Sequence, residues 1–343
     1  MPSAADDIRS AIAEANGAIA FEQFMAIALY GPNGFYQQGG SAGRRGDFIT
    51  SPEIGPLFGA VLARALDQWW DELGRPSVYT VVEVGAGPGT LARSIRVAEP
   101  LCWTALRYVA VEVSAAQRFR HPDWVTSVAA MPTEPFVGVI LANELLDNLP
   151  LRLLVMDGEW REAFVVARPD GSFGEVLRSV ELPVELPVAA HGSRVPVQQQ
   201  AAEWVKSSLD LLQVGRVVAI DYTRPTTLSV AAVPWREWLR TYAGHERGQH
   251  YLKQPGMQDI TSDVVLDQLA DLVGWSPEIE SQANFLARFG IHDLVAAGQA
   301  FWTAHAASPS VEAMRMRSRV RESEALCEPF GLGSFNVLTW TTP

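Results

Sequence analysis

The feature that most constrains the fold is a short β-branched run that ends in three glycines. Residues 79–84 read Tyr-Thr-Val-Val-Glu-Val, which predicts a buried strand, and Gly85, Gly87 and Gly89 follow before a helical pattern begins at Thr90. Glycines let the backbone turn sharply and approach a ligand closely. The spacing by itself is weak evidence, but a strand before it and a helix after it indicate a cofactor-binding loop.

The rest of the chain repeats this rhythm of strand and helix. Apolar runs at 107–113, 137–142 and 217–222 predict further buried strands, and helical patterns separate them. Strands that alternate with helices are typical of a parallel, doubly wound sheet. The sequence therefore predicts an α/β, Rossmann-like fold.

Two stretches interrupt the rhythm. Residues 151–178 alternate about two Asp-Gly pairs, which predicts an antiparallel β insertion. Prolines indicate a linker over 180–198, residues 234–262 read as loop-rich, and residues 3–29 read as helix with breaks near Gly17. The expected domains are an N-terminal helical and lid region over 1–75, and a cofactor domain over 76–343 with insertions at 151–198 and 234–262.

Composition restricts the classes of partner and the compartment. The 39 acids against 27 bases give a formal net charge of −12, which disfavours nucleic acid and suits either a cationic substrate or mere solubility. The two cysteines have no metal-ligand spacing, so no metal is expected. No apolar run is long enough for a membrane span. The N-terminus lacks the features of a signal or transit peptide, which predicts a cytoplasmic protein.

The glycine loop and an acid one strand later indicate which cofactor binds. Glu112 ends the second predicted strand, where a carboxylate can accept both ribose hydroxyls of an adenosine. The G-x-G-x-G spacing, with Glu83 before it, favours S-adenosylmethionine (SAM) over a dinucleotide. The predicted cofactor-binding residues are Glu83, Gly85, Ala86, Gly87, Gly89, Thr90, Leu91, Glu112, Val113 and Asn143.

Ordered motifs along residues 20–340 resemble the MidA-type family of class I methyltransferases, whose mitochondrial members act in respiratory complex I assembly. The matching stretches are 34–36, 46–54, 57–59, 83–91, 111–117, 143–150, 220–222, 240–245, 255–261, 284–286 and 331–335. The resemblance implies a class I methyltransferase sheet with a helical N-terminal extension and an antiparallel β insertion. It also implies SAM-dependent N-methylation of a protein arginine, with a respiratory complex subunit as a candidate partner.

Five residues are candidates for the chemistry at the methyl group. Carboxylates can bind a guanidinium and polarise its attacking nitrogen. Glu144 follows the strand at 137–142, at the edge of the sheet where ligands bind. The predicted catalytic set is Glu144, Asp47, Glu53, Asp147 and His245.

Each of these candidates has a structural alternative. Asp47 and Glu53 would equally suit a helix start at Ser51-Pro52, and Asp147 would suit hydrogen bonding behind the site. His245 would suit a structural position. The sequence departs from the family pattern beside the ligand, at Pro88, Leu145, Leu146, Asn148 and Thr223.

Two other functions therefore stay open: methylation of a small-molecule oxygen or nitrogen, and a non-catalytic assembly factor that either binds SAM or does not. The acceptor, the degree of methylation and the oligomeric state are not determined by the sequence, and a homodimer is one option.

Overall fold

A central sheet of seven strands organises the chain. The computed structural model describes residues 2–37, 50–182, 184–244 and 246–342. The strand order is β4–β3–β2–β5–β10–β17–β16, in which the first five strands pair in parallel and the last two run antiparallel to their neighbours. The bounds are β2 Tyr79–Val84, β3 Leu106–Val111, β4 Thr126–Val128, β5 Phe136–Asn143, β10 Leu212–Asp221, β16 Glu278–Ser281 and β17 Asn336–Thr341. This arrangement confirms the predicted α/β fold.

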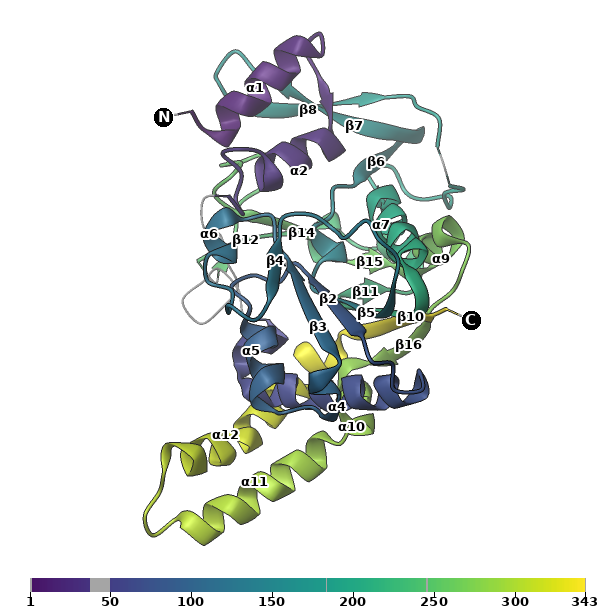
Figure 1. Cartoon of the computed structure of the whole chain (residues 1–343). Helices are drawn as coiled ribbons and strands as arrows, with labels where there is room; N and C mark the ends of the chain where they lie inside the picture. The colour runs from purple at the N-terminus through teal and green to yellow at the C-terminus, as the bar shows by residue number, and fades with distance from the viewer. Residues whose placement is uncertain (1, 38–49, 183, 245, 343) are drawn as a thin grey trace.

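Helices cover both faces of the sheet because its strands are apolar on both sides. On one face pack α4 (Pro56–Glu72), α5 (Thr90–Val97) and α10 (Gln282–Arg288). On the other pack α7 (Gln199–Asp210) and α9 (Leu266–Val273), as Figure 1 shows. The carboxyl ends of β2, β3, β5 and β10 are thereby left as the open edge.

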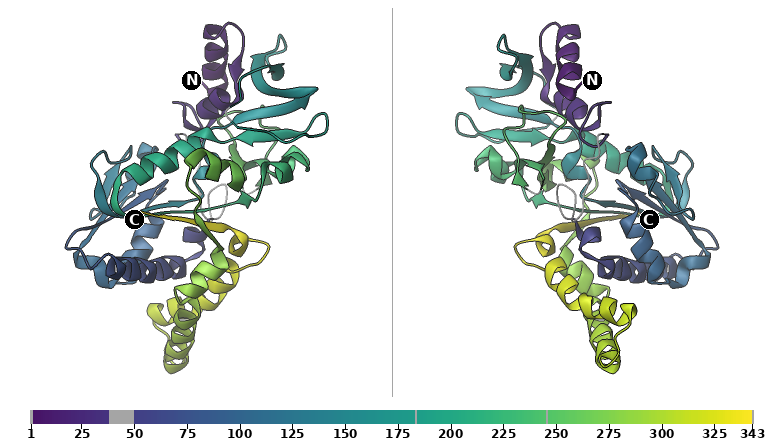
Figure 2. Two further views of the ribbon diagram at one scale, coloured as in Figure 1. Left: turned by 90° about the vertical axis from the view of Figure 1, so that its right-hand side faces the viewer. Right: turned by 90° about the vertical axis from the view of Figure 1, so that its left-hand side faces the viewer.

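A second, antiparallel sheet faces that edge. It contains β6 (Arg152–Asp157), β7 (Glu159–Ala167), β8 (Phe173–Arg178), β9 (Arg194–Val197) and β1 (Ile19–Ala20). The helices α1 (Ala4–Glu14) and α2 (Phe21–Tyr30) share an apolar core with it, at the top of Figure 1 and of both views in Figure 2. The predicted β insertion is therefore present.

The helical stretch over 3–29 is interrupted where a break near Gly17 was expected, because Asn16 and Gly17 take left-handed φ values of 56° and 99° that end α1. Two other details of the prediction were wrong. The expected linker over 180–198 ends in β9, which pairs with β6. The loop-rich stretch 234–262 contains a small sheet of β12 (Leu239–Ala243), β13 (Glu246–Arg247) and β14 (Asp259–Ser262).

The remaining elements are short connections. They are α3 Ser51–Ile54, α6 Ala115–Arg118, α8 Thr227–Ala231, η1 Leu101–Thr104, η2 Leu146–Asn148, η3 Trp235–Glu237, η4 Leu332–Ser334, and the parallel pair β11 Thr223–Arg224 and β15 Val264–Val265. Among the described residues no helix has the length and apolar character needed to cross a membrane. The same residues include no cluster of three or more His, Cys, Asp or Glu suited to a metal.

The domain boundary expected at residue 75 stays a prediction. In the structure the N-terminal residues divide between two cores. The helices α1 and α2 pack with the second sheet, whereas α4 packs on the central sheet.

A helical arm projects from the body of the protein. It is formed by α11 (Ile291–His305) and α12 (Val311–Leu326), which pack along each other (Figures 1 and 2). The buried carboxylate of Glu322 ties α12 to the start of α4, because its Oε2 accepts a hydrogen bond of 2.8 Å from the amide of Leu57. An added Cβ on Gly55 would lie 2.4 Å from the Glu322 Cδ, so a larger residue there would displace the Glu322 carboxylate.

We expect Glu322→Ala to lower the free energy of unfolding by about 2 kcal/mol, since it leaves the α4 amide without its charged acceptor. Glu324→Ala changes an exposed acid two residues away on the same helix and serves as the control. Urea unfolding of both variants measures the difference. Equal stability of the two variants would contradict the role given to Glu322.

Candidate functional site

The glycine loop after β2 adopts a conformation that only glycine accepts readily. Gly85, Gly87 and Gly89 have φ values of 71°, 52° and 79°, all in the left-handed region. The Gly87 amide donates a hydrogen bond of 2.9 Å to Glu112 Oε2, and the Ser114 amide donates one of 2.8 Å to Glu112 Oε1. The carboxylate of Glu112 therefore joins the ends of β2 and β3.

A cavity of about 340 Å³ lies over this loop. It is lined by nine of the ten residues predicted to bind the cofactor, and Gly89 is the exception. The nine are Glu83, Gly85, Ala86, Gly87, Thr90, Leu91, Glu112, Val113 and Asn143. The structure thus brings the predicted cofactor segments together, although it does not by itself test their roles.

Unpartnered polar atoms in the cavity wall fit a polar ligand such as SAM. The Oγ of Ser114, the Oε1 of Gln117 and the Oδ1 of Asn143 are buried and have no hydrogen-bond partner among the described residues. Buried polar atoms normally have partners, so these positions suit ligand hydroxyl and amino groups. Ser114 and Gln117 were absent from the predicted set, although the segment 111–117 was singled out.

Glu83 and Glu112 are both buried beneath the cavity. Burial raises the pKa of Glu83 to about 8, although the Tyr108 hydroxyl donates a hydrogen bond of 2.7 Å to its Oε2. Burial also raises the pKa of Glu112, against the opposing effect of its two amide donors. Each Glu112 oxygen accepts one amide and can accept one further hydrogen bond.

Glu144 follows the carboxyl end of β5, is half-buried and lines the cavity. Its backbone has φ 53°, a left-handed value that is uncommon for any residue other than glycine. Asn143 Nδ2 donates to Oε1 at 3.1 Å, and the Tyr222 hydroxyl donates to Oε2 at 3.2 Å. Burial, with the nearby Asp147 carboxylate, raises the pKa of Glu144 to about 8.

Asp147 lies behind this position rather than in the cavity wall. It is 3% exposed, and its Oδ1 has no hydrogen-bond partner in the described part of the chain. Burial, together with the neighbouring Asp221 and Asp259, raises the pKa of Asp147 well above its usual range. This position agrees with the structural alternative considered for Asp147.

The sequence prediction missed a tyrosine pair in the cavity wall and the buried Asp259 to which it is bonded. Tyr30 and Tyr36 stack with ring centroids 5.4 Å apart and both line the cavity. The Tyr36 hydroxyl and Asn148 Nδ2 donate to Asp259 Oδ1 at 3.0 and 3.1 Å. The available signals were the stretches 34–36 and 255–261, which matched family motifs but carried no assigned role.

Of the three other predicted catalytic residues, the structure describes only one. Glu53 lines the cavity, and it also lies in the first turn of α3 beside Pro52, as the helix-start alternative predicts. Asp47 and His245 lie outside the described residues. Of the five predicted catalytic residues, the structure therefore places Glu144 and Glu53 in the cavity wall and Asp147 outside it.

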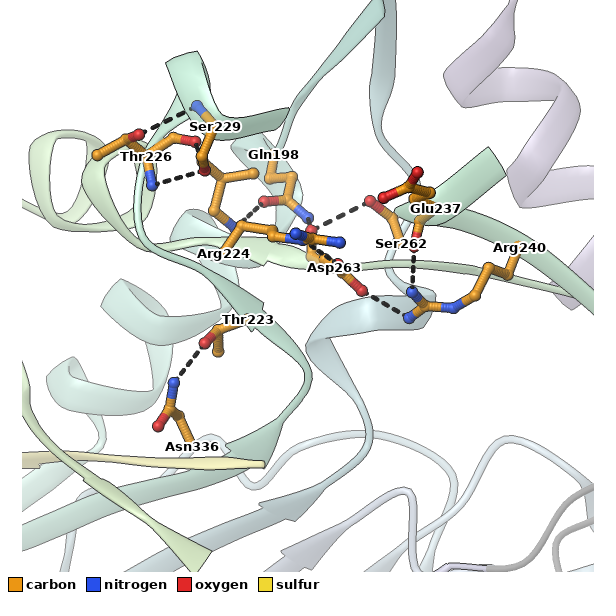
Figure 3. A network of polar contacts seen from close by, with 11 residues as sticks. Gln198, Thr223, Arg224, Thr226, Ser229, Glu237, Arg240, Ser262, Asp263 and Asn336 are labelled. Atoms are coloured by element: carbon orange, nitrogen blue, oxygen red, sulfur yellow. Dashed lines mark hydrogen bonds and ion pairs between the residues drawn. The ribbon is translucent and has the colours of Figure 1, made fainter. Parts of the chain in front are cut away.

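Arg224 and Arg240 are both engaged by the carboxylate of Asp263. Arg240 Nη2 and Arg224 Nε donate to the two oxygens of Asp263 at 2.6 and 2.8 Å, as Figure 3 shows. Arg240 also donates to the Glu237 carbonyl at 2.7 Å and lies over the Tyr222 ring. Among the described residues, Glu144, Asp147 and Asp221 make no ion pair.

Comparison with curated proteins relates this chain to mitochondrial methyltransferases. The Drosophila melanogaster "Protein arginine methyltransferase NDUFAF7 homolog, mitochondrial" is 30% identical over 285 residues, which cover 72% of this chain and 65% of the relative. The human "Protein arginine methyltransferase NDUFAF7, mitochondrial" is 36% identical over 294 residues, covering 73% and 64%. The match thus spans somewhat less than two thirds of these relatives.

These names contradict one prediction. The expectation of a cytoplasmic protein was wrong in the light of the relatives, which are named as mitochondrial in fly, zebrafish and human. The N-terminal composition on which that expectation depended does not decide the compartment.

Solved structures and a family description relate this chain to SAM-dependent methyltransferases. A COG1565 superfamily member from Burkholderia thailandensis, bound to S-adenosyl-homocysteine, superposes with a TM-score of 0.83 at 27% identity, covering 99% of this chain and 92% of that one. A native structure of a Burkholderia thailandensis protein of that superfamily gives 0.81 at 26% identity, covering 99% and 91%. Residues 61–280 match the family described as "Putative S-adenosyl-L-methionine-dependent methyltransferase". This chain belongs to that family, Methyltransf_28, of SAM-dependent methyltransferases.

Proposed function

We propose that this protein transfers a methyl group from SAM to a guanidinium nitrogen of an arginine in a partner protein. The observation that carries the proposal is the group formed by the half-buried Glu144 and the buried Asp147 and Asp221, which lie at the open edge of the sheet without an ion-paired base among the described residues. Buried carboxylates are costly unless a cation compensates them. An arginine side chain that enters the cavity supplies that cation.

The cofactor half of the cavity is assigned to residues already described. The backbone of Gly85–Gly87 seats the methionine part of SAM, and Glu112 accepts hydrogen bonds from the ribose hydroxyls. When bound, SAM supplies an activated methyl group on a sulfonium. Asn143 and Ser114 have free acceptor or donor capacity toward the same ligand.

Glu144 provides the chemistry on the acceptor side. Its carboxylate accepts hydrogen bonds from the guanidinium N–H groups and receives the proton that the nitrogen loses as the C–N bond forms. Tyr222 and Asn143 fix the two oxygens, so the carboxylate keeps one orientation. Glu53, Asp147, Asp47 and His245 stay predicted contributors, and the residues before 75 stay a predicted lid.

The names of the relatives support the acceptor and the partner. Proteins named as arginine methyltransferases match most of this chain, and the family resemblance points to a respiratory complex subunit as the partner. The rival functions make different predictions. A scaffold that binds no SAM fails the first experiment below, and a small-molecule enzyme fails the third.

Calorimetric titration with SAM tests the cofactor assignment. We expect binding to the wild type in the micromolar range, and binding about 100-fold weaker to Glu112→Ala, which loses two charge-assisted hydrogen-bond acceptors. Glu134→Ala removes an exposed acid and serves as the control. No heat with the wild type would favour a non-catalytic assembly factor.

The pH dependence of methyl transfer tests Glu144 as the base. Because its pKa is raised to about 8, the carboxylate is mostly protonated at pH 7. We expect kcat/KM to rise about tenfold per pH unit up to about pH 8 and then to level off. Glu144→Gln should lower kcat by about 100-fold or more and abolish that rise, with SAM affinity unchanged. A flat profile in the wild type would refute the assignment.

Mass spectrometry tests the partner. We expect a monomethylated or dimethylated arginine in a respiratory complex subunit from cells that carry the gene, and its loss from cells that lack it. Complementation with Glu144→Gln should not restore the modification, whereas the wild type should. Identical arginine methylation with and without the gene would show that the respiratory complex subunit is not the substrate.

A further inference from the structure

We propose that Asp221 is a positioning residue for the methyl transfer, because its carboxylate clamps the turn after β5 to the end of β10 and so holds Glu144 and Tyr222 at the cavity. The inference rests on the proposed function of the cavity. Asp221 itself is not part of the cavity wall, so its effect must pass through the residues that it holds.

The carboxylate of Asp221 is buried, and both of its oxygens accept hydrogen bonds from backbone amides. The side chain is 1% exposed. Its Oδ2 accepts the amides of Leu146 and Asp147 at 2.9 and 3.3 Å, and its Oδ1 accepts the amide of Tyr222 at 2.9 Å. One side chain thus bonds to the backbone on both sides of the edge where Glu144 stands.

Glu144 is held from both directions along the chain. Its own amide donates to the Ile220 carbonyl at 2.8 Å, and the residues just after it are bonded to Asp221. Its φ of 53° is unfavourable for a side chain with a Cβ, so the turn relaxes unless its neighbours fix it. A strained residue held by its surroundings is typical of a functional position.

Only a carboxylate satisfies these three donors. Both oxygens of Asp221 accept backbone N–H groups, and an asparagine in the same place turns its NH₂ group toward one of them. The NH₂ group and the backbone N–H repel each other, which displaces the turn after β5. Glu144 and the Tyr222 hydroxyl then shift relative to the methyl group. A displacement of about 1 Å can slow a reaction by about 100-fold.

The test compares Asp221→Asn with Asp267→Asn. Asp267 makes the same kind of backbone contacts, since it accepts the amides of Thr227 and Gln268, but it lies on α9 outside the cavity wall. Two quantities are measured for each variant and the wild type. The first is amide hydrogen exchange over residues 145–149, and the second is the set of constants kcat, peptide KM and SAM Kd with the arginine peptide identified by the methylation comparison.

We expect Asp221→Asn to speed exchange of the Leu146 and Asp147 amides and to lower kcat by about 10- to 100-fold, with KM and Kd within about twofold of the wild type. Asp267→Asn should change none of these quantities. Combining Asp221→Asn with Glu144→Gln should slow the reaction no further than Glu144→Gln alone, because both act through the same carboxylate.

Three results would overturn the inference: unchanged exchange in Asp221→Asn, unchanged kcat, or a fall in kcat equal to that of Asp267→Asn. A wild type that methylates no arginine peptide would instead overturn the proposed function. In that case the exchange measurement still decides whether Asp221 clamps the turn. The two failures are therefore distinguishable.

Discussion

The structure depends on the close parallel pairing of β2, β5 and β10. Two glycines make this pairing possible: a Cβ on Gly138 would lie 1.8 Å from the Thr80 carbonyl oxygen, and one on Gly215 would lie 1.8 Å from that of Gly138. Because parallel strands end together, the pairing places the glycine loop, Glu144 and Asp221 at one edge. The contacts among these three groups are possible because their strands end at the same level.

The same edge concentrates buried acids, which oppose folding. Desolvation is the first cause of the raised pKa of Glu83, Glu144 and Asp221, and hydrogen bonds from Tyr108, Tyr222 and backbone amides only partly offset it. Arg224 and Arg240 pair with Asp263, and the charge of Arg240 offsets only part of the rise in the pKa of Asp147. The fold therefore sacrifices stability at the place where a cationic ligand would restore it.

Sequence reasoning found what is local or periodic. The β-branched strands, the glycine loop and the Asp-Gly turns have signals within a few residues, and the family motifs predicted the family correctly. The strands β9 and β12–β14 are short and carry no clear alternation, so they were read as linker and loop. Contacts such as Tyr36 with Asp259 join positions 223 residues apart, and no local pattern predicts them. The compartment was misjudged because composition at one end of a chain does not determine it.

Because the pKa values of several carboxyl groups are raised, the folded protein binds protons at neutral pH that the unfolded chain releases. Glu83 and Glu144, each with a pKa of about 8, are mostly neutral at pH 7, so the formal −12 includes two charges that these groups largely lack in the folded protein. Since these groups hold protons more tightly when folded than when unfolded, the stability that they contribute is full below about pH 4.5 and declines toward pH 8. A cation that docks at Glu144 would displace the proton from its carboxyl group. Substrate binding would therefore be coupled to proton release.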